Sequence, residues 1–130
     1  MIEVSKAKGS YIYDNNNKKY LDFVAGVSAC SVGHCNEEVI NAIKAQSEKY
    51  MHVMVYGEFV TKPSLELAKL LAKNLPNSLN CTYFTNSGTE ALEGSMKLAR
   101  RFTGRKKIIA AKNAYHGSTM GALTLMGLEE

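Results

Sequence analysis

The sequence predicts an α/β fold with a largely parallel sheet, and the observations that predict it lie in the second half. Asn80–Phe84 has the composition of a short strand and runs directly into a helix that extends to about Phe102. Lys107–Lys112 contains a second compact strand, Ile-Ile-Ala-Ala. The order strand, helix, strand is typical of a βαβ unit. We therefore expect this half to form the start of a larger parallel sheet.

The first half predicts a hairpin, a helix and an irregular stretch. The run from Gly9 to Phe23 is expected to form a hairpin, because Tyr11 and Tyr13 alternate along one strand and an Asp/Asn cluster follows at the turn. Asn36 fits the N-cap of a helix that fades near Tyr50, with two glutamates in its first turn. Residues 51–60 mix apolar and polar side chains and are expected to be irregular. A further helix is expected to begin near Pro63 and to end at Pro76.

Length and composition indicate a globular protein and exclude several classes. The chain has 130 residues, 45% hydrophobic and 22% charged, which is enough to bury a core. A net charge of +4 falls short of the dense basic face of a nucleic-acid-binding protein. The uncharged stretch Phe23–Asn36 is too short and too rich in small residues to span a bilayer. We expect no nucleic-acid partner and no membrane partner.

The cysteines favour a reducing compartment and no metal. Cys30, Cys35 and Cys81 are an odd number without a disulfide pattern, and the start of the chain has no secretory signal. His34 adjoins Cys35, but a second pair of zinc ligands is missing from the sequence pattern. We expect buried or partly buried free thiols and a cytoplasmic protein.

The turn before the third helix, Thr85-Asn-Ser-Gly-Thr-Glu, is a candidate anion site. A helix N-terminus offers unpaired N–H groups and a partial positive charge, and Gly88 lets an anion approach the backbone. Ser87 and Thr89 add hydroxyl groups, and Ser87 with Glu90 has the spacing of a capping box. A plain helix cap without a ligand is the alternative. Neither the P-loop nor the dinucleotide fingerprint is present.

The loop Tyr115-His-Gly-Ser follows the second expected strand. In a parallel sheet, loops at the carboxyl ends of strands share one face, so Tyr115 is expected on the same side as the Ser87–Thr89 turn. An aromatic face beside an anion site suits a flat, phosphorylated heteroaromatic ligand. The alternative is that Tyr115 packs in the core and His116 makes only local hydrogen bonds.

The run FTNSGTEALEGSMKLARR at 84–101, followed by NAYHGST at 113–119, resembles the class III aminotransferases. This family includes the acetylornithine, ornithine and 4-aminobutyrate aminotransferases. The runs YIYD and KYLDF near the start, and GVSACSVGH at 26–34, also fit. The resemblance implies a pyridoxal phosphate-dependent transferase of fold type I, similar to aspartate aminotransferase. This chain would contain only part of that fold. Residues 1–60 would form an amino-terminal segment, and residues 61–130 would form the start of the large cofactor-binding domain.

The resemblance also implies roles for particular residues. Pyridoxal 5′-phosphate would be bound by Ser87, Gly88, Thr89, Tyr115 and His116, and substrate by Val27, Ser28 and Tyr56. Glu90 and Glu93 would lie on the helix behind the phosphate turn. The lysine that forms a Schiff base with the cofactor matches none of Lys97, Lys106, Lys107 and Lys112. We expect it beyond Glu130, so that the chain is an amino-terminal fragment with exposed apolar faces.

The implied activity is transfer of an amino group between an amino acid or amine and a 2-oxo acid, in a homodimer of the full-length enzyme. Two alternatives remain: an aminomutase of the same family, and a non-catalytic module that binds a phosphorylated ligand. Many family members have Arg directly after His-Gly, where it helps to bind a substrate carboxylate. This chain has Ser118 there, so the amino donor is left open.

Overall fold

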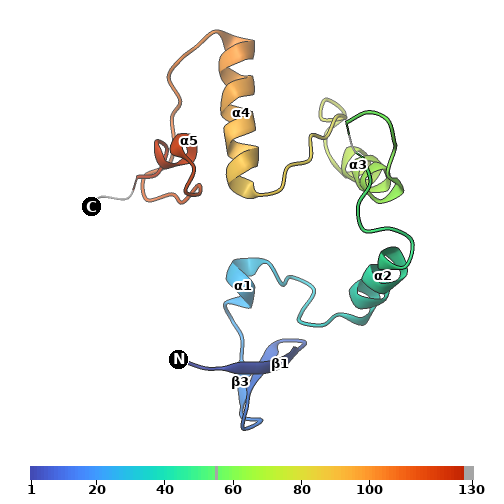
Figure 1. Cartoon of the computed structure of the whole chain (residues 1–130). Coiled ribbons are helices and arrows are strands. Elements are labelled where there is room, and N and C mark those ends of the chain that lie inside the picture. Colours follow the sequence, from blue (N-terminus) through green and yellow to red (C-terminus); the bar gives the residue numbers. More distant parts are fainter. Residues whose placement is uncertain (55, 128–130) are drawn as a thin grey trace. The chain divides into compact units, whose positions relative to one another are not determined.

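The computed structural model describes residues 1–54 and 56–127, and it divides into two compact units, Met1–Thr61 and Lys62–Glu130. The first unit contains a small sheet, the short turn α1 and the helix α2 (Figure 1). The second unit contains α3, α4 and α5.

The first unit begins with a three-stranded antiparallel sheet of order β1-β2-β3. The predicted hairpin is confirmed as β2 (Tyr11–Asp14) and β3 (Lys19–Leu21), paired with Ile12 opposite Tyr20. The Asp14 carboxylate accepts hydrogen bonds from two backbone N–H groups of the turn and from the Tyr20 hydroxyl. A strand that the sequence did not predict, β1 (Val4–Lys8), pairs along β2.

The segment after the hairpin is tied back to the sheet. Gly9 and His34 exchange two backbone hydrogen bonds of 2.9 and 2.8 Å, N to O. A Cβ on Gly33 would lie 3.3 Å from the Gly9 backbone, so the two chain segments approach closely there. Between them lies α1 (Ala25–Ser28), a single turn with left-handed backbone angles.

The two middle helices follow the sequence pattern. α2 (Glu37–Ser47) has Asn36 as its N-cap, whose side chain accepts from the Val39 N–H at 3.2 Å, as predicted. α3 (Lys62–Asn74) begins one residue before Pro63 and ends before Pro76, as predicted.

The second unit continues with α4 (Gly88–Thr103) and α5 (Met120–Leu123). α4 begins after Ser87, and Gly104 ends it in the left-handed conformation (φ 68°) that glycine adopts without strain. α4 and α5 pack against each other. This contact brings the loop that precedes α5 to the first turns of α4.

The prediction of strands at Asn80–Phe84 and Lys107–Lys112 is wrong for the described residues. Neither segment pairs with the other, and the described residues contain only the three strands of the amino-terminal sheet. A strand needs hydrogen bonds from a neighbour, and composition alone does not supply one. Both apolar runs have a composition suited to strands, but neither has a strand to pair with among the described residues.

Hydrophobic burial within the described residues is limited to Met96 and Ala122, the latter with no exposed surface. The stripe expected to face inward on α4 (Ala91, Ser95, Leu98 and Phe102) is exposed, with Phe102 at 88%. That prediction is wrong for the described residues, because the pattern marks an apolar face and nothing in the described residues covers it. The large number of exposed apolar side chains agrees with the expectation that this chain has exposed apolar faces.

Candidate functional site

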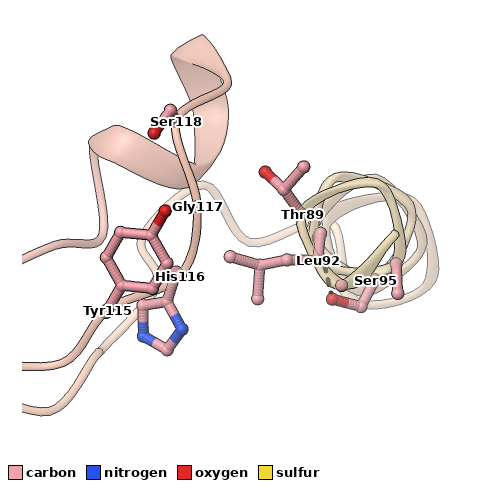
Figure 2. Close-up of a pocket in the computed structure, with 9 residues that line it drawn as sticks. Thr89, Leu92, Ser95, Tyr115, His116, Gly117 and Ser118 are labelled. Carbon is pink, nitrogen blue, oxygen red and sulfur yellow. Dashed lines mark hydrogen bonds between the residues drawn. The ribbon is translucent and has the colours of Figure 1, made fainter. Parts of the chain in front are cut away.

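An open hollow of about 870 Å³ lies between the start of α4 and the loop before α5. Its lining residues are Gly88, Thr89, Ala91, Leu92, Ser95, Tyr115, His116, Gly117 and Ser118. Figure 2 shows Tyr115 and His116 on the loop, facing Thr89 and Leu92 of the helix. The volume is within the usual range for small-molecule sites, about 300–1,000 Å³.

Four of the five predicted cofactor residues line this hollow: Gly88, Thr89, Tyr115 and His116. The fifth, Ser87, is the N-cap, and its hydroxyl accepts the Glu90 N–H at 3.3 Å. Both sequence motifs therefore line the hollow: the turn at the start of α4 forms one side and the Tyr115–Ser118 loop forms the other.

The α4 N-terminus has the capping box only in altered form. Ser87 accepts from the Glu90 N–H, but the Glu90 carboxylate accepts from the Asn86 N–H at 2.8 Å, one residue earlier than the usual partner. The Glu90 carboxylate therefore binds the backbone of the turn that precedes α4. Its carboxylate does not occupy the N–H groups of the first helical residues.

The backbone N–H groups of Gly88 and Thr89 have no hydrogen-bond acceptor among the described residues. They lie at the positive end of a 16-residue helix, where anions are stabilised. A Cβ on Gly88 would have open space around it, with no atom within 4 Å. Two free donors beside an open position have the chemistry of an anion cradle.

The loop side of the hollow presents an aromatic ring. Tyr115 is 72% exposed, so the alternative in which it packs in a core does not hold within the described residues. His116 is half-buried next to it. Gly117 is buried with φ +109°, and a Cβ there would overlap the Thr89 side chain. Only glycine fits where the loop crosses the helix.

Two contacts hold this loop to α4. The Thr89 and Thr119 hydroxyl oxygens are 2.8 Å apart. The Glu93 carboxylate accepts the Gly121 N–H at 2.8 Å. The two residues of each pair lie 30 and 28 positions apart in the sequence, so these contacts stabilise tertiary rather than local structure.

The predicted substrate residues Val27 and Ser28 lie in the left-handed turn α1 of the first unit. Ala25, Gly26, Val27 and Ser28 have φ values of 48°, 63°, 58° and 65°. Side chains other than glycine are strained there, at a cost of about 1–2 kcal/mol per residue. Val27 is 87% exposed on this turn, so its side chain does not pack against the other described residues.

Tyr56, the third predicted substrate residue, is 87% exposed in the irregular stretch of the first unit. Val27, Ser28 and Tyr56 belong to Met1–Thr61, whereas the cofactor residues belong to Lys62–Glu130. The role of these three residues in substrate binding stays a prediction.

Several lining residues were missed from the sequence. Leu92 and Ser95 lie four and seven residues after Gly88, so helical periodicity places them on the same face as the predicted anion site. Glu93 was placed on the helix behind the turn, but its contact with Gly121 had no such signal, because it joins positions 28 residues apart. The expectation that the thiols are buried or partly buried holds for Cys30, but Cys35 and Cys81 are exposed.

The described residues contain no cluster of three His, Cys, Asp or Glu side chains placed to bind a metal ion. Among them, no helix is long and apolar enough to cross a bilayer. Lys97, Lys106, Lys107 and Lys112 are all exposed.

Similarity to known proteins defines the class. The family model described as aminotransferase class-III matches residues 1–130. The chain belongs to this family, and class-III aminotransferases are generally pyridoxal phosphate enzymes. Curated relatives include the acetylornithine aminotransferases of Archaeoglobus fulgidus, 40% identical over 99% of this chain, and of Methanosarcina mazei, 43% identical over 95%. The chain spans about a third of the length of these relatives, 33% and 30% respectively.

Solved structures show the same fold. The adenosylmethionine-8-amino-7-oxononanoate aminotransferase of Methanocaldococcus jannaschii matches with a TM-score of 0.90 at 34% identity, over 98% of this chain and 30% of its own. An (S)-enantioselective omega-transaminase of Thermomicrobium roseum matches with a TM-score of 0.90 at 32% identity, again over 98% and 30%. The predicted α/β fold type I, present here in part, is therefore confirmed.

Proposed function

We propose that this chain provides the phosphate- and ring-binding part of a pyridoxal phosphate site in an aminotransferase. The enzyme would transfer an amino group between an amino acid or amine and a 2-oxo acid. The observation that carries the proposal is the hollow in which the free N–H groups of Gly88 and Thr89 face the same space as the exposed Tyr115 ring.

The residues present fit the cofactor. A phosphate needs several donors in a fixed arrangement, and Gly88 and Thr89 supply two backbone N–H groups with no Cβ in the way. The Ser87 hydroxyl still has its own hydrogen to donate while it accepts from Glu90. The ring needs an aromatic partner, and most of the Tyr115 surface is available for stacking.

Pyridoxal phosphate supplies an electron-withdrawing ring that stabilises negative charge at the carbon bearing the amino group. The residues of this chain bind and orient that ring. The α4 N-terminus holds the phosphate at one end, and Tyr115 fixes the plane of the ring. His116 borders the same space and would shape its edge. Val27, Ser28 and Tyr56 would contact the substrate.

The substrates are proposed from the chemistry and from relatives. Relatives with 40–43% identity are named acetylornithine aminotransferases, which supports an amino acid donor. The neutral Ser118 on the lining supports donors without a carboxylate, because it cannot form a bidentate charged pair. Both donor types therefore belong in the assay. The relatives favour transamination over an aminomutase or a non-catalytic module. The enzyme is proposed to be a cytoplasmic homodimer.

The test uses the natural protein that contains this chain. Purified protein is mixed with pyridoxal phosphate, and the visible absorbance and the retention of cofactor after dialysis are measured. Acetylornithine and a simple amine are then offered as donors with a 2-oxo acid acceptor. Retained cofactor and a new amino acid product are expected. Protein that binds no pyridoxal phosphate would overturn the proposal, and cofactor binding without transfer would point to the non-catalytic module.

A further inference from the structure

Glu93 stands out among the charged residues because it links two segments without touching the hollow. Its residue is half-buried on α4, and it is absent from the lining of the cofactor hollow. One carboxylate oxygen accepts the Gly121 N–H at 2.8 Å. The contact joins α4 to the start of α5, directly after the loop that carries Tyr115.

The environment of Glu93 favours the ionised carboxylate. A hydrogen bond from the Thr119 hydroxyl is the largest cause that holds the pKa of Glu93 below its ordinary value. Burial opposes this effect. The N–H groups of Gly121 and Ala122 and the charge of Lys97 act in the same direction as Thr119. Glu93 therefore accepts hydrogen bonds from the loop as an anion.

Thr89 meets the same loop. Its hydroxyl oxygen lies 2.8 Å from that of Thr119, and either hydroxyl can donate in this contact. The Thr89 side chain is thereby held toward the loop. Its backbone N–H has no acceptor among the described residues and remains available to an anion.

The close fit supports the same assignment. A Cβ on Gly121 would overlap the Glu93 carboxylate, and a Cβ on Gly117 would overlap the Thr89 side chain. At Gly117 the loop therefore meets α4 with no space for a methyl group, and at Gly121 a methyl group would displace the Glu93 carboxylate from its hydrogen bond. Both contacts support close packing of the loop on the helix.

We propose that Glu93 is a positioning residue of the cofactor site. Its carboxylate docks the Tyr115–Ser118 loop on α4 and so fixes the distance between the phosphate donors and the ring-stacking face. The proposal rests on the function proposed above. A ligand that contains both a phosphate and a ring requires this spacing, whereas a ligand with only one of the two does not.

The experiment compares Glu93→Gln, Glu93→Ala and Gly121→Ala in the natural protein. Glu66→Gln is the matched control, since Glu66 is an exposed helical carboxylate that pairs only with Lys69 over 3.2 Å in the described residues. Dissociation constants are measured for pyridoxal phosphate and for inorganic phosphate. Because hydrogen bonds to a charged group are lost, Glu93→Ala is expected to weaken pyridoxal phosphate binding about tenfold to hundredfold. Phosphate binding should change much less.

The conservative variant and the glycine variant sharpen this result. Glu93→Gln keeps one oxygen acceptor and should have a smaller effect than Glu93→Ala. Gly121→Ala should resemble Glu93→Ala, and the double variant should be no worse than the stronger single one. Equal loss of phosphate and pyridoxal phosphate binding would overturn the positioning role, as would wild-type affinity in Glu93→Ala.

Hydrogen exchange gives a readout independent of cofactor. In Glu93→Gln, amide exchange over residues 115–122 is expected to accelerate while the middle of α4 keeps its protection. Unchanged exchange in the loop would overturn the docking role. If the wild type binds no pyridoxal phosphate, the proposed function fails, and this exchange measurement alone decides whether Glu93 docks the loop.

Discussion

The Asp22 carboxylate lies 2.6 Å from Nε2 of His34, and this contact ties the left-handed turn to the sheet. The other Asp22 oxygen accepts the N–H groups of Val24 and Ala25 at 3.0 and 2.9 Å, where the turn begins. His34 is also paired with Gly9 through the backbone. Both side chains are mostly buried, with 13% of Asp22 and 20% of His34 exposed. One carboxylate thus joins the hairpin end to the segment that carries Val27 and Ser28.

Asp22→Asn is expected to impair substrate binding more than cofactor binding. The amide keeps one acceptor but loses the charge, so the left-handed residues lose support against their backbone strain. KM for the amino donor should rise about tenfold, and the dissociation constant for pyridoxal phosphate should not change. Asp14 is the other aspartate of this sequence, and Asp14→Asn serves as the control. It should alter the stability of the protein without altering KM. Equal effects of both variants on KM would contradict the role of Asp22.

The Asp22 contact also predicts a pH dependence. The hydrogen bond from His34 is the largest cause that lowers the pKa of Asp22, followed by the Ala25 N–H. A lowered pKa in the folded state means that the stabilisation is complete at neutral pH and is lost as the pH falls through that value. The urea midpoint of the wild type should therefore fall more steeply in acid than that of Asp22→Asn. Parallel curves for the two proteins would disprove this linkage.

Gly88→Ala tests the anion cradle without disturbing the helix. No atom lies within 4 Å of the added Cβ, and Gly88 does not have a left-handed φ, so the chain itself tolerates alanine. The methyl group enters the space proposed for the phosphate and should weaken pyridoxal phosphate binding about tenfold or more. Affinity is measured by absorbance titration.

Gly94→Ala is the matched control in the same helix. Its Cβ also meets open space, and alanine in a helix interior stabilises by about 0.5–1 kcal/mol relative to glycine. The melting temperature should rise slightly and the cofactor affinity should stay the same. If the Gly88→Ala and Gly94→Ala variants bound the cofactor equally well, the phosphate would not bind beside Gly88, and the proposed anion site would be wrong.

Tyr115→Phe and Tyr115→Ala separate stacking from hydrogen bonding. The ring is 72% exposed toward solvent and the hollow, so its removal leaves little packing unfilled. Aromatic pairing contributes about 0.5–1.5 kcal/mol, so the alanine variant should bind pyridoxal phosphate about two- to tenfold more weakly. The phenylalanine variant should bind as the wild type does. A loss of affinity in the phenylalanine variant would instead assign the effect to the hydroxyl.

Ser118→Arg tests the donor preference. Ser118 is exposed on the lining of the hollow, so a longer side chain has room there. A guanidinium can pair with a substrate carboxylate, and kcat/KM for amino acid donors should rise a few-fold relative to amines. Ser118→Ala should leave the ratio unchanged. A shift toward amines in the arginine variant would contradict the assignment.

Local patterns were sufficient for the helices and the hairpin. Asn36, Ser87 and Gly104 act within one or two turns of their own positions, so their neighbours in sequence determine the outcome. The two motifs that line the hollow were also predictable as short local motifs, and their role in cofactor binding stays a prediction. β1 was missed because its residues have little alternation and pair only through β2.

The sequence by itself determined the family and the residues of the two motifs that line the hollow. Only the tertiary structure decided how these motifs are held together. Glu93 reaches Gly121, Thr89 reaches Thr119, and Asp22 reaches His34 across 12 to 30 residues of chain. The structure also decided that two apolar runs expected to be strands have no pairing within the described residues. Periodicity and capping depend on near neighbours, whereas docking and strand pairing depend on surfaces brought together by folding.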